Sequence, residues 1–342
     1  MWDQTWWVQQ AGVLLAGLLQ HAEYRVEVQH RHLDFFARVV APYLGVSRPA
    51  RCAWPSFMTD DGTPLEMSWE WGSGAPVIRY SIEPIGLHAG TPLDPANLAA
   101  APAFHKHMLQ HLPSARLEWF DHFYAFFNGC LVEEQTDFAR DPGDHNTSMF
   151  YAFDLPRGDD DITVKAYFFP KIRARRRGQT NLNVLLDAIF SAPCVDPVKM
   201  RAATALRDFC HEARTNNLEH EMLAIDLADP VDGRIKIYFR SRKTSFDSVC
   251  HIMTLGGRHR LWKAVLGVDT DPVDDLPVSN DHRTAGILYN VELRQDDASP
   301  VAKIYIPVRH YTNSDADVIC GLGSYFGNTA SVARYKEAMR ML

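Results

Sequence analysis

Three short segments of the chain each place a lysine two residues before a tyrosine. They read VKAYFFP at 164–170, IKIYFRS at 235–241 and AKIYIPV at 302–308. The pairs are Lys165 with Tyr167, Lys236 with Tyr238, and Lys303 with Tyr305. Each segment is typical of a β-strand, in which residues i and i+2 share one face. The sequence therefore predicts the same ammonium beside the same phenol on three separate strands.

Cations and phenols gathered on one surface suit the ionisation of an allylic diphosphate. At an effective dielectric near 20, two unit charges about 4 Å apart interact by about 4 kcal/mol before desolvation, so several cations could hold a diphosphate without a metal ion. The candidate cations are Arg79, Lys165, Arg234, Lys236 and Lys303. Tyrosine ring faces can stabilise a carbocation by about 0.5–2 kcal/mol each, and a dry chamber would keep water from quenching it.

The elements that would position these side chains repeat along the chain. Each of the three strands follows an earlier strand across a turn-rich break, which predicts a β-hairpin. In a fourth hairpin, nearer the N-terminus, Arg79 takes the place of the lysine and Ser81 that of the tyrosine. The predicted hairpins span 64–84, 147–170, 221–241 and 286–308. Pairs of segments with helical character precede the hairpins, and a fifth pair, at 315–326 and 331–342, follows the last one.

The apolar face of each strand must pack against these helices, which leaves the polar face pointing away from them. Hairpins joined in sequence with all helices on one side can close into a barrel, and the lysines and tyrosines would then line its lumen. The alternative is an open sheet whose polar face is wet. Repetition of the same pair in three repeats favours the lumen. We expect one domain, 1–342, built of repeats at about 1–85, 86–171, 172–241 and 242–311, with a partial repeat at 312–342.

The bulk properties of the chain exclude several classes of protein. It has 342 residues and a formal net charge of -7, which argues against a non-specific nucleic-acid binder. No apolar run reaches the ~18 residues that a membrane span needs, and no His/Cys spacing indicates a metal site. The six cysteines form no C-x-x-C pair, which is typical of thiols in a reducing compartment and predicts a cytoplasmic location. The basic run KIRARRR at 171–177 is interpreted as a solvated turn.

Several motifs together resemble the dimethylallyltryptophan synthase-type family of aromatic prenyltransferases. They are PSFMTDDGTPLEMSWEW at 55–71, the Lys-x-Tyr repeats, and KIYIPVRHYTNSDADVICGL at 303–322, and the resemblance covers almost the whole chain from Trp6 onward. It implies an α+β fold, the αββα (ABBA) barrel, in which antiparallel strands line a lumen and helices lie outside. This chain supplies four of the five hairpins of such a barrel, so the sequence is either a fragment or a natively incomplete barrel.

The implied activity is the metal-independent transfer of a dimethylallyl group from an allylic diphosphate to an electron-rich aromatic ring. The acceptor implied is most often an indole (tryptophan, a cyclic dipeptide or a related alkaloid), alkylated in a Friedel–Crafts manner in secondary metabolism. The alternative is a catalytically degenerate relative that binds diphosphate or an aromatic ligand without turnover. The expected partners are the acceptor and the prenyl diphosphate alone, with no nucleic acid, membrane, cofactor or metal, in a monomer or homodimer.

The resemblance also implies roles for individual residues. Glu66 matches the glutamate that accepts a hydrogen bond from the indole N–H, and Phe57, Met58 and Phe169 match acceptor-binding positions. The five candidate cations match diphosphate-contacting positions, although many members have glutamine where this chain has Lys303. The tyrosines that match the shield around the allyl cation are Tyr167, Tyr238 and Tyr305.

Two departures from the family pattern bear on the acceptor. Many tryptophan-specific members carry a lysine on the strand that faces Glu66, and the stretch 144–155 contains none, so His145 or Glu66 is the expected base. Tryptophan-binding members also tend to have an arginine near the start of the fifth strand, where this chain has His220. A cyclic dipeptide, another indole or a phenol therefore remains open beside tryptophan.

Overall fold

The chain divides into two compact units, which are described one at a time. Unit 1 comprises Met1–Phe168, Asp226–Ala228 and Ile319–Leu342, and unit 2 comprises Phe169–Ile225 and Asp229–Val318. The computed structural model describes residues 2–46, 54–70, 76–133, 145–212, 215, 217–255, 282–295, 297, 300–312, 314–326 and 329–340. Organisation as a single domain of repeats stays a prediction.

Unit 1 contains two consecutive β-hairpins that form one antiparallel arrangement of strands. The strands are β1 (Leu65–Glu70), β2 (Val77–Ile82), β3 (Met149–Leu155) and β4 (Thr163–Phe168), and each pairs with the next in chain order. The helices are α1 (Trp2–His21), α2 (Val26–Phe35), α3 (Ala100–Leu109), α4 (Glu118–Glu133) and α11 (Thr329–Met339). A π-helical turn at Phe36–Val40 and a 3-10 turn at Ala41–Tyr43 continue α2.

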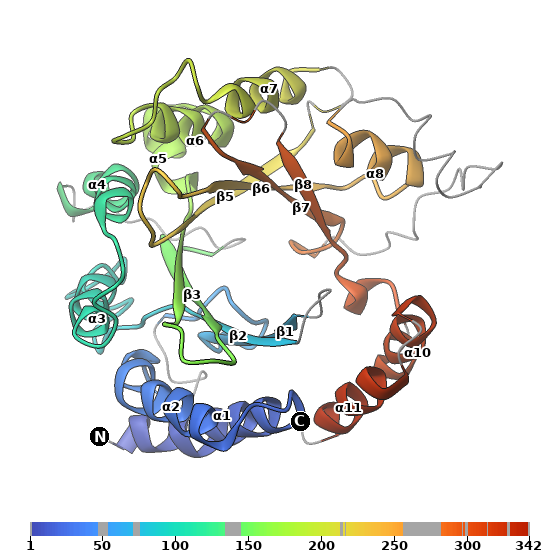
Figure 1. Cartoon of the computed structure of the whole chain (residues 1–342). Coiled ribbons are helices and arrows are strands. Elements are labelled where there is room, and N and C mark those ends of the chain that lie inside the picture. Colours follow the sequence, from blue (N-terminus) through green and yellow to red (C-terminus); the bar gives the residue numbers. More distant parts are fainter. Residues whose placement is uncertain are drawn as a thin grey trace. The chain divides into compact units, whose positions relative to one another are not determined.

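The helices of unit 1 pack on one face of its strands, where the core lies. In Figure 1, α1 and α2 lie beside β1 and β2, and α3 and α4 lie beside β3. The ring centroids of Phe36 and Tyr80 are 5.8 Å apart, and those of Phe104 and Tyr151 are 5.0 Å apart. Phe168 is fully buried on the same face. The alternation of buried and less buried residues along β2 leaves Arg79 and Ser81 on the opposite face.

Unit 2 repeats the same plan. Its strands are β5 (Glu219–Asp226), β6 (Ile235–Ser241), β7 (Ile287–Leu293) and β8 (Val301–Tyr305), again antiparallel and paired in chain order. Its helices are α5 (Lys171–Arg177), α6 (Asn181–Phe190), α7 (Arg201–Cys210) and α8 (Phe246–Met253), and α10 (Asp315–Phe326) crosses the boundary between the units. Ile235, Ile237 and Phe239 are fully buried, so the core of this unit also lies on the apolar face of the hairpins.

The basic run at 171–177 is a helix, and its interpretation as a turn was wrong. The segment forms α5, which follows Pro170 and ends at Gly178 with φ 61. Glycine adopts this left-handed conformation without steric cost, so Gly178 is suited to end a helix there. Arginine and lysine are also good helix formers. Local propensity and a capping glycine therefore outweigh mutual repulsion among the basic side chains.

The sequence indicated that the chain has no membrane-spanning segment and that its cysteines are free thiols. Within the described ranges, no helix is long and apolar enough to cross a membrane. Disulfides are likewise absent among the four cysteines whose side chains are described, namely Cys194, Cys210, Cys250 and Cys320. Cys52 and the side chain of Cys130 lie outside the described residues.

Candidate active site

In unit 1 two of the predicted diphosphate cations share one carboxylate. Asp154 on β3 lies between Arg79 on β2 and Lys165 on β4. The Nε of Arg79 is 2.9 Å from Oδ1 of Asp154, and the ammonium of Lys165 forms an ion pair with Oδ2. Arg79 also forms an ion pair with Glu70. The cations are therefore held in place by internal counter-charges that an incoming anion would have to compete with.

Strand register places Glu66 on the same face as these cations. Glu66 pairs with Ser81, Ser81 with Ala152, and Ala152 with Lys165, so the four residues form one row across the sheet of unit 1. Directly opposite residues on neighbouring strands project to the same face. Glu66 is exposed at the β1 end of this row, and β3 contributes only the methyl group of Ala152.

Aromatic side chains connect three predicted site residues of unit 1. The ring of Phe57 lies 4.9 Å from that of His145 and 5.2 Å from that of Phe150, measured between centroids. Phe150 in turn stacks on Tyr167 at 4.2 Å, with the two rings 14° from parallel. The structure thus brings a predicted acceptor-binding residue, a predicted base and a predicted shield tyrosine into one chain of ring contacts.

A buried carboxylate that the sequence analysis missed anchors this region. Glu83, directly after β2, is 2 % exposed. Its Oε1 accepts a hydrogen bond from Trp54 Nε1 at 2.8 Å, and its Oε2 accepts from Ser56 Oγ at 2.6 Å and Thr147 Oγ1 at 2.9 Å. Burial raises the pKa of Glu83 to about 7, although donation from these three side chains and the Phe57 backbone N–H opposes the rise. The alternation of Arg79, Ser81 and Glu83 along one face was the available sequence signal.

In unit 2 the arrangement of cations around a carboxylate recurs. Glu292 on β7 lies 3.2 Å from Arg234 Nη1 and 3.8 Å from Lys236 Nζ through its Oε2, and Arg294 Nε is 3.0 Å from its Oε1. Burial acts to raise the pKa of Glu292, but the positive charges of Arg234, Lys236 and Arg294 prevail and lower it. Glu292 is therefore ionised at neutral pH and holds Arg234 and Lys236, the two predicted cations of the preceding hairpin.

The two predicted shield tyrosines of unit 2 also lie together. Tyr238 pairs with Asn290, and Asn290 pairs with Lys303, so these residues form a second row across the strands. Asn290 is buried and donates from Nδ2 to the hydroxyl of Tyr305 at 2.8 Å. The ring centroids of Tyr238 and Tyr305 are 6.0 Å apart. Asn290, another residue that sequence analysis did not single out, thus orients one tyrosine toward the other. Phe169, another predicted acceptor-binding residue, is buried after β4.

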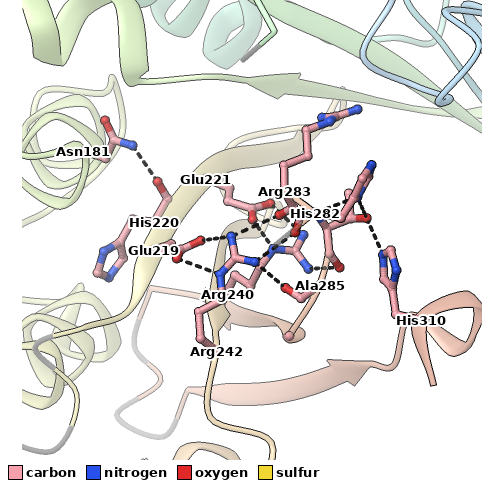
Figure 2. Close-up of polar contacts among 12 residues, drawn as sticks. Asn181, Glu219, His220, Glu221, Arg240, Arg242, His282, Arg283, Ala285 and His310 are labelled. Atoms are coloured by element: carbon pink, nitrogen blue, oxygen red, sulfur yellow. Dashed lines mark hydrogen bonds and ion pairs between the residues drawn. The ribbon is translucent and has the colours of Figure 1, made fainter. Parts of the chain in front are cut away.

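Beyond Tyr238 the polar face of unit 2 ends in two arginine–glutamate pairs (Figure 2). Arg240 is buried, with its Nε 2.6 Å from Glu221 Oε1 and its Nη1 donating to the Thr284 carbonyl at 3.0 Å. Arg242 pairs with Glu219 at 2.8 Å and donates to carbonyls of the segment 282–285. These contacts fix the segment that leads into β7.

His220 lies on the opposite side of the hairpin from those arginines. Its Nε2 is 3.3 Å from Cys210 Sγ on α7, and its ring is 5.8 Å from that of Phe239. Burial lowers the pKa of His220 to about 4, so its imidazole is neutral at pH 7. His220 therefore packs among helix-facing residues, whereas Arg240, paired with Glu221, lies on the polar face.

Comparison with solved structures gives the fold. AnaPT from Neosartorya fischeri matches with a TM-score of 0.79 and 24% sequence identity, over 99% of this chain and 85% of that one. NotF in complex with brevianamide F and DMSPP matches with a TM-score of 0.79 and 20% identity, over 99% of this chain and 85% of that one. A second solved structure of NotF names that protein a prenyltransferase. The predicted α+β fold of the αββα prenyltransferases is confirmed.

The sequence comparisons give the family. The family model for tryptophan dimethylallyltransferase matches residues 3–339, and this chain belongs to that family. It is 38% identical to 4-O-dimethylallyl-L-tyrosine synthase of Claviceps purpurea, over 93% of this chain and 75% of that protein. It is 34% identical to 7-dimethylallyltryptophan synthase of Aspergillus fumigatus, over 94% of this chain and 73% of that protein. The chain is therefore an aromatic prenyltransferase, as the sequence analysis predicted, while the roles of single residues stay predictions.

Proposed function

We propose that this chain transfers a dimethylallyl group from dimethylallyl diphosphate to the phenol oxygen of L-tyrosine, without a metal ion. The observation that carries the proposal is the 38% identity to 4-O-dimethylallyl-L-tyrosine synthase across 93% of the chain. L-Tryptophan is the second candidate acceptor, because the 34% identical relative is named for that amino acid. The proposal includes a cytoplasmic location and small-molecule partners only.

The composition of the Glu66 row supports a phenol as acceptor. Alkylation at a ring carbon leaves a proton on that carbon, and a base must remove it to restore aromaticity. Alkylation at a phenol oxygen requires only loss of the O–H proton. Since β3 contributes Ala152 to this row rather than a basic residue, the Glu66 carboxylate is the group of the row best suited to accept a phenolic proton.

In the proposed reaction, the bond between C1 of the prenyl group and the diphosphate oxygen breaks, and its electron pair leaves with the diphosphate. A lone pair of the tyrosine oxygen forms the new C1–O bond, and the phenolic proton passes to Glu66. Arg79 and Lys165 of unit 1 are candidates to bind the diphosphate, as are Arg234, Lys236 and Lys303 of unit 2. Tyr167, Tyr238 and Tyr305 are candidates to shield the allyl cation, because aromatic faces attract cations.

The carboxylates that pair with the candidate cations affect how a diphosphate would bind. Asp154 and Glu292 already form ion pairs with four of the five candidate cations. A diphosphate would therefore exchange a carboxylate for a phosphate oxygen rather than bind to bare positive charge. This exchange limits how tightly the diphosphate product is held, which favours its release after the reaction.

The test is incubation of the chain with dimethylallyl diphosphate, EDTA and either L-tyrosine or L-tryptophan, followed by mass spectrometry. We expect a tyrosine product heavier by one dimethylallyl group. Glu66→Gln should lower turnover by at least about 100-fold, since it removes the proton acceptor. Glu27→Gln, which changes an exposed helical glutamate on α2, is the matched control and should retain full activity. Absence of product with both acceptors would contradict the proposal, and a strong preference for tryptophan would replace tyrosine by the second candidate.

A further inference from the structure

Glu83 joins two segments that are separate in sequence and that both carry predicted site residues: Phe57 and Met58, which are predicted to bind the acceptor, and His145, a predicted base. The first segment supplies Trp54 Nε1, Ser56 Oγ and the Phe57 backbone N–H as donors to the carboxylate. The second supplies Thr147 Oγ1, two residues after His145. All of these groups belong to unit 1. One buried side chain thus ties the loop before β1 to the loop before β3.

Packing alone does not account for a carboxylate at this position. Burying a carboxylate costs free energy, and an apolar side chain of similar volume would fill the same space more cheaply. A fully satisfied polar network, in contrast, fixes its members in one arrangement. Glu83 has donors for both oxygens, so the network gains a defined geometry at the expense of stability.

The hydrogen bonds around Glu83 fix the segments that carry the predicted site residues Phe57, Met58 and His145. The Ser56 hydroxyl that donates to Glu83 also accepts the Met58 backbone N–H at 3.2 Å. The neighbouring Phe57 ring contacts His145 and Phe150 at centroid distances of 4.9 Å and 5.2 Å. Glu83 therefore acts on Phe57 through its backbone N–H, on Met58 through Ser56, and on the segment of His145 through Thr147.

We propose that Glu83 is a positioning residue that holds Phe57 and His145 against each other and so sets the orientation of the aromatic acceptor. The inference rests on the proposed function, because it takes these residues as the acceptor's neighbours. The role assigned to Glu83 involves no contact with the diphosphate donor. Its loss is therefore expected to change acceptor binding and product position while donor binding is retained.

The experiment compares wild type with Glu83→Gln and Ser56→Ala. The amide introduced by Glu83→Gln keeps one acceptor oxygen, so its NH2 group would face either the Trp54 N–H at the Oε1 position or the two hydroxyls that share Oε2. Ser56→Ala removes a single donor and leaves the carboxylate in place. The matched control is Asn97→Ala. Asn97 is buried, has φ 52, accepts from Gly86 N and donates to the Pro84 carbonyl, so its loss removes two hydrogen bonds to the segment after Glu83 and leaves the donors to the Glu83 carboxylate in place.

For Glu83→Gln we expect the KM for the acceptor to rise about tenfold and the KM for dimethylallyl diphosphate to change less than about twofold. A broader mixture of prenylated positions should accompany the change, and Ser56→Ala should shift both readouts in the same direction but less. An unchanged acceptor KM, or equal effects on both substrates that Asn97→Ala reproduces, would overturn the role of Glu83.

Acceptor affinity measured by calorimetry, with L-tyrosine as the probe, separates the inference from the proposed function. If wild type turns over no acceptor, the proposed function fails. If wild type is active and Glu83→Gln binds L-tyrosine with the same affinity, only the inference about Glu83 fails. Weaker binding of L-tyrosine by Glu83→Gln, together with an unchanged diphosphate affinity, supports it. Calorimetry also covers the case in which the variant folds but is too slow to assay.

Discussion

The protonation of Glu83 predicts an unusual dependence of stability on pH. Burial raises the pKa of this carboxyl from an ordinary value of 4.5 to about 7 in the folded chain. The folded state therefore binds the proton more tightly than the unfolded state. The stabilising contribution of protonated Glu83 is fully present below pH 4.5 and is lost as pH rises through about 7.

The size of the effect follows from the shift. A change from 4.5 to about 7, at about 1.4 kcal/mol for each pH unit, corresponds to a loss of about 3 kcal/mol in the free energy of unfolding. Most buried carboxylates that are paired with cations behave in the opposite way, because their pKa is lowered. The direction of the change therefore distinguishes Glu83 from groups such as Glu292, whose pKa is lowered by its cationic neighbours against the effect of burial.

The assay is urea unfolding of wild type and Glu83→Gln at a series of pH values from about 4.5 to 8. Every other titrating group is common to both proteins, so it cancels in the difference between their free energies of unfolding. We expect wild type to lose about 3 kcal/mol relative to Glu83→Gln across this range. A difference that stays constant within about 1 kcal/mol, or that grows in favour of wild type as pH rises, would refute the reasoning.

Three further changes test other parts of the structure. Asp154→Asn removes the negative charge shared by two candidate diphosphate cations, so inhibition by inorganic pyrophosphate should become several-fold stronger; weaker or equal inhibition would contradict the proposed competition. Glu292→Gln should have the same effect on pyrophosphate inhibition from unit 2, with Glu27→Gln as the control that leaves it unchanged. Phe168→Ala deletes a fully buried ring that packs against α4, so the free energy of unfolding should fall by about 3–5 kcal/mol; a urea-unfolding loss below about 1 kcal/mol would show that the site collapses around the cavity.

The hairpins were predictable from sequence because each one alternates apolar and polar residues and is broken by turn residues. The expected spans 64–84 and 286–308 contain β1 with β2 and β7 with β8. The pairing of Lys165 with Tyr167 on one face also follows from alternation alone. The α5 helix was missed because KIRARRR was interpreted as a solvated turn from its charge alone, without regard to helix propensity or to the glycine that follows.

The carboxylates that organise the site were harder to predict. Asp154 and Glu292 meet their cations across strands, and cross-strand neighbours depend on register, which a single strand does not encode. Glu83 continues the alternation of Arg79 and Ser81, but Pro84 follows it and marks the end of the strand. Its donors come from segments 29 and 64 residues away, so the alternation places Glu83 on the polar face but cannot identify the groups that bind it.

The central claim is the transfer of a prenyl group to the phenol oxygen of an aromatic acceptor. NMR of the product formed from L-tyrosine and dimethylallyl diphosphate, in the presence of EDTA, tests it most directly. The account predicts a single aryl ether, with the new CH₂ group bonded to the tyrosine oxygen and all ring protons retained. Formation of ring-carbon products alone, or no product while pyrophosphate still binds, would contradict it.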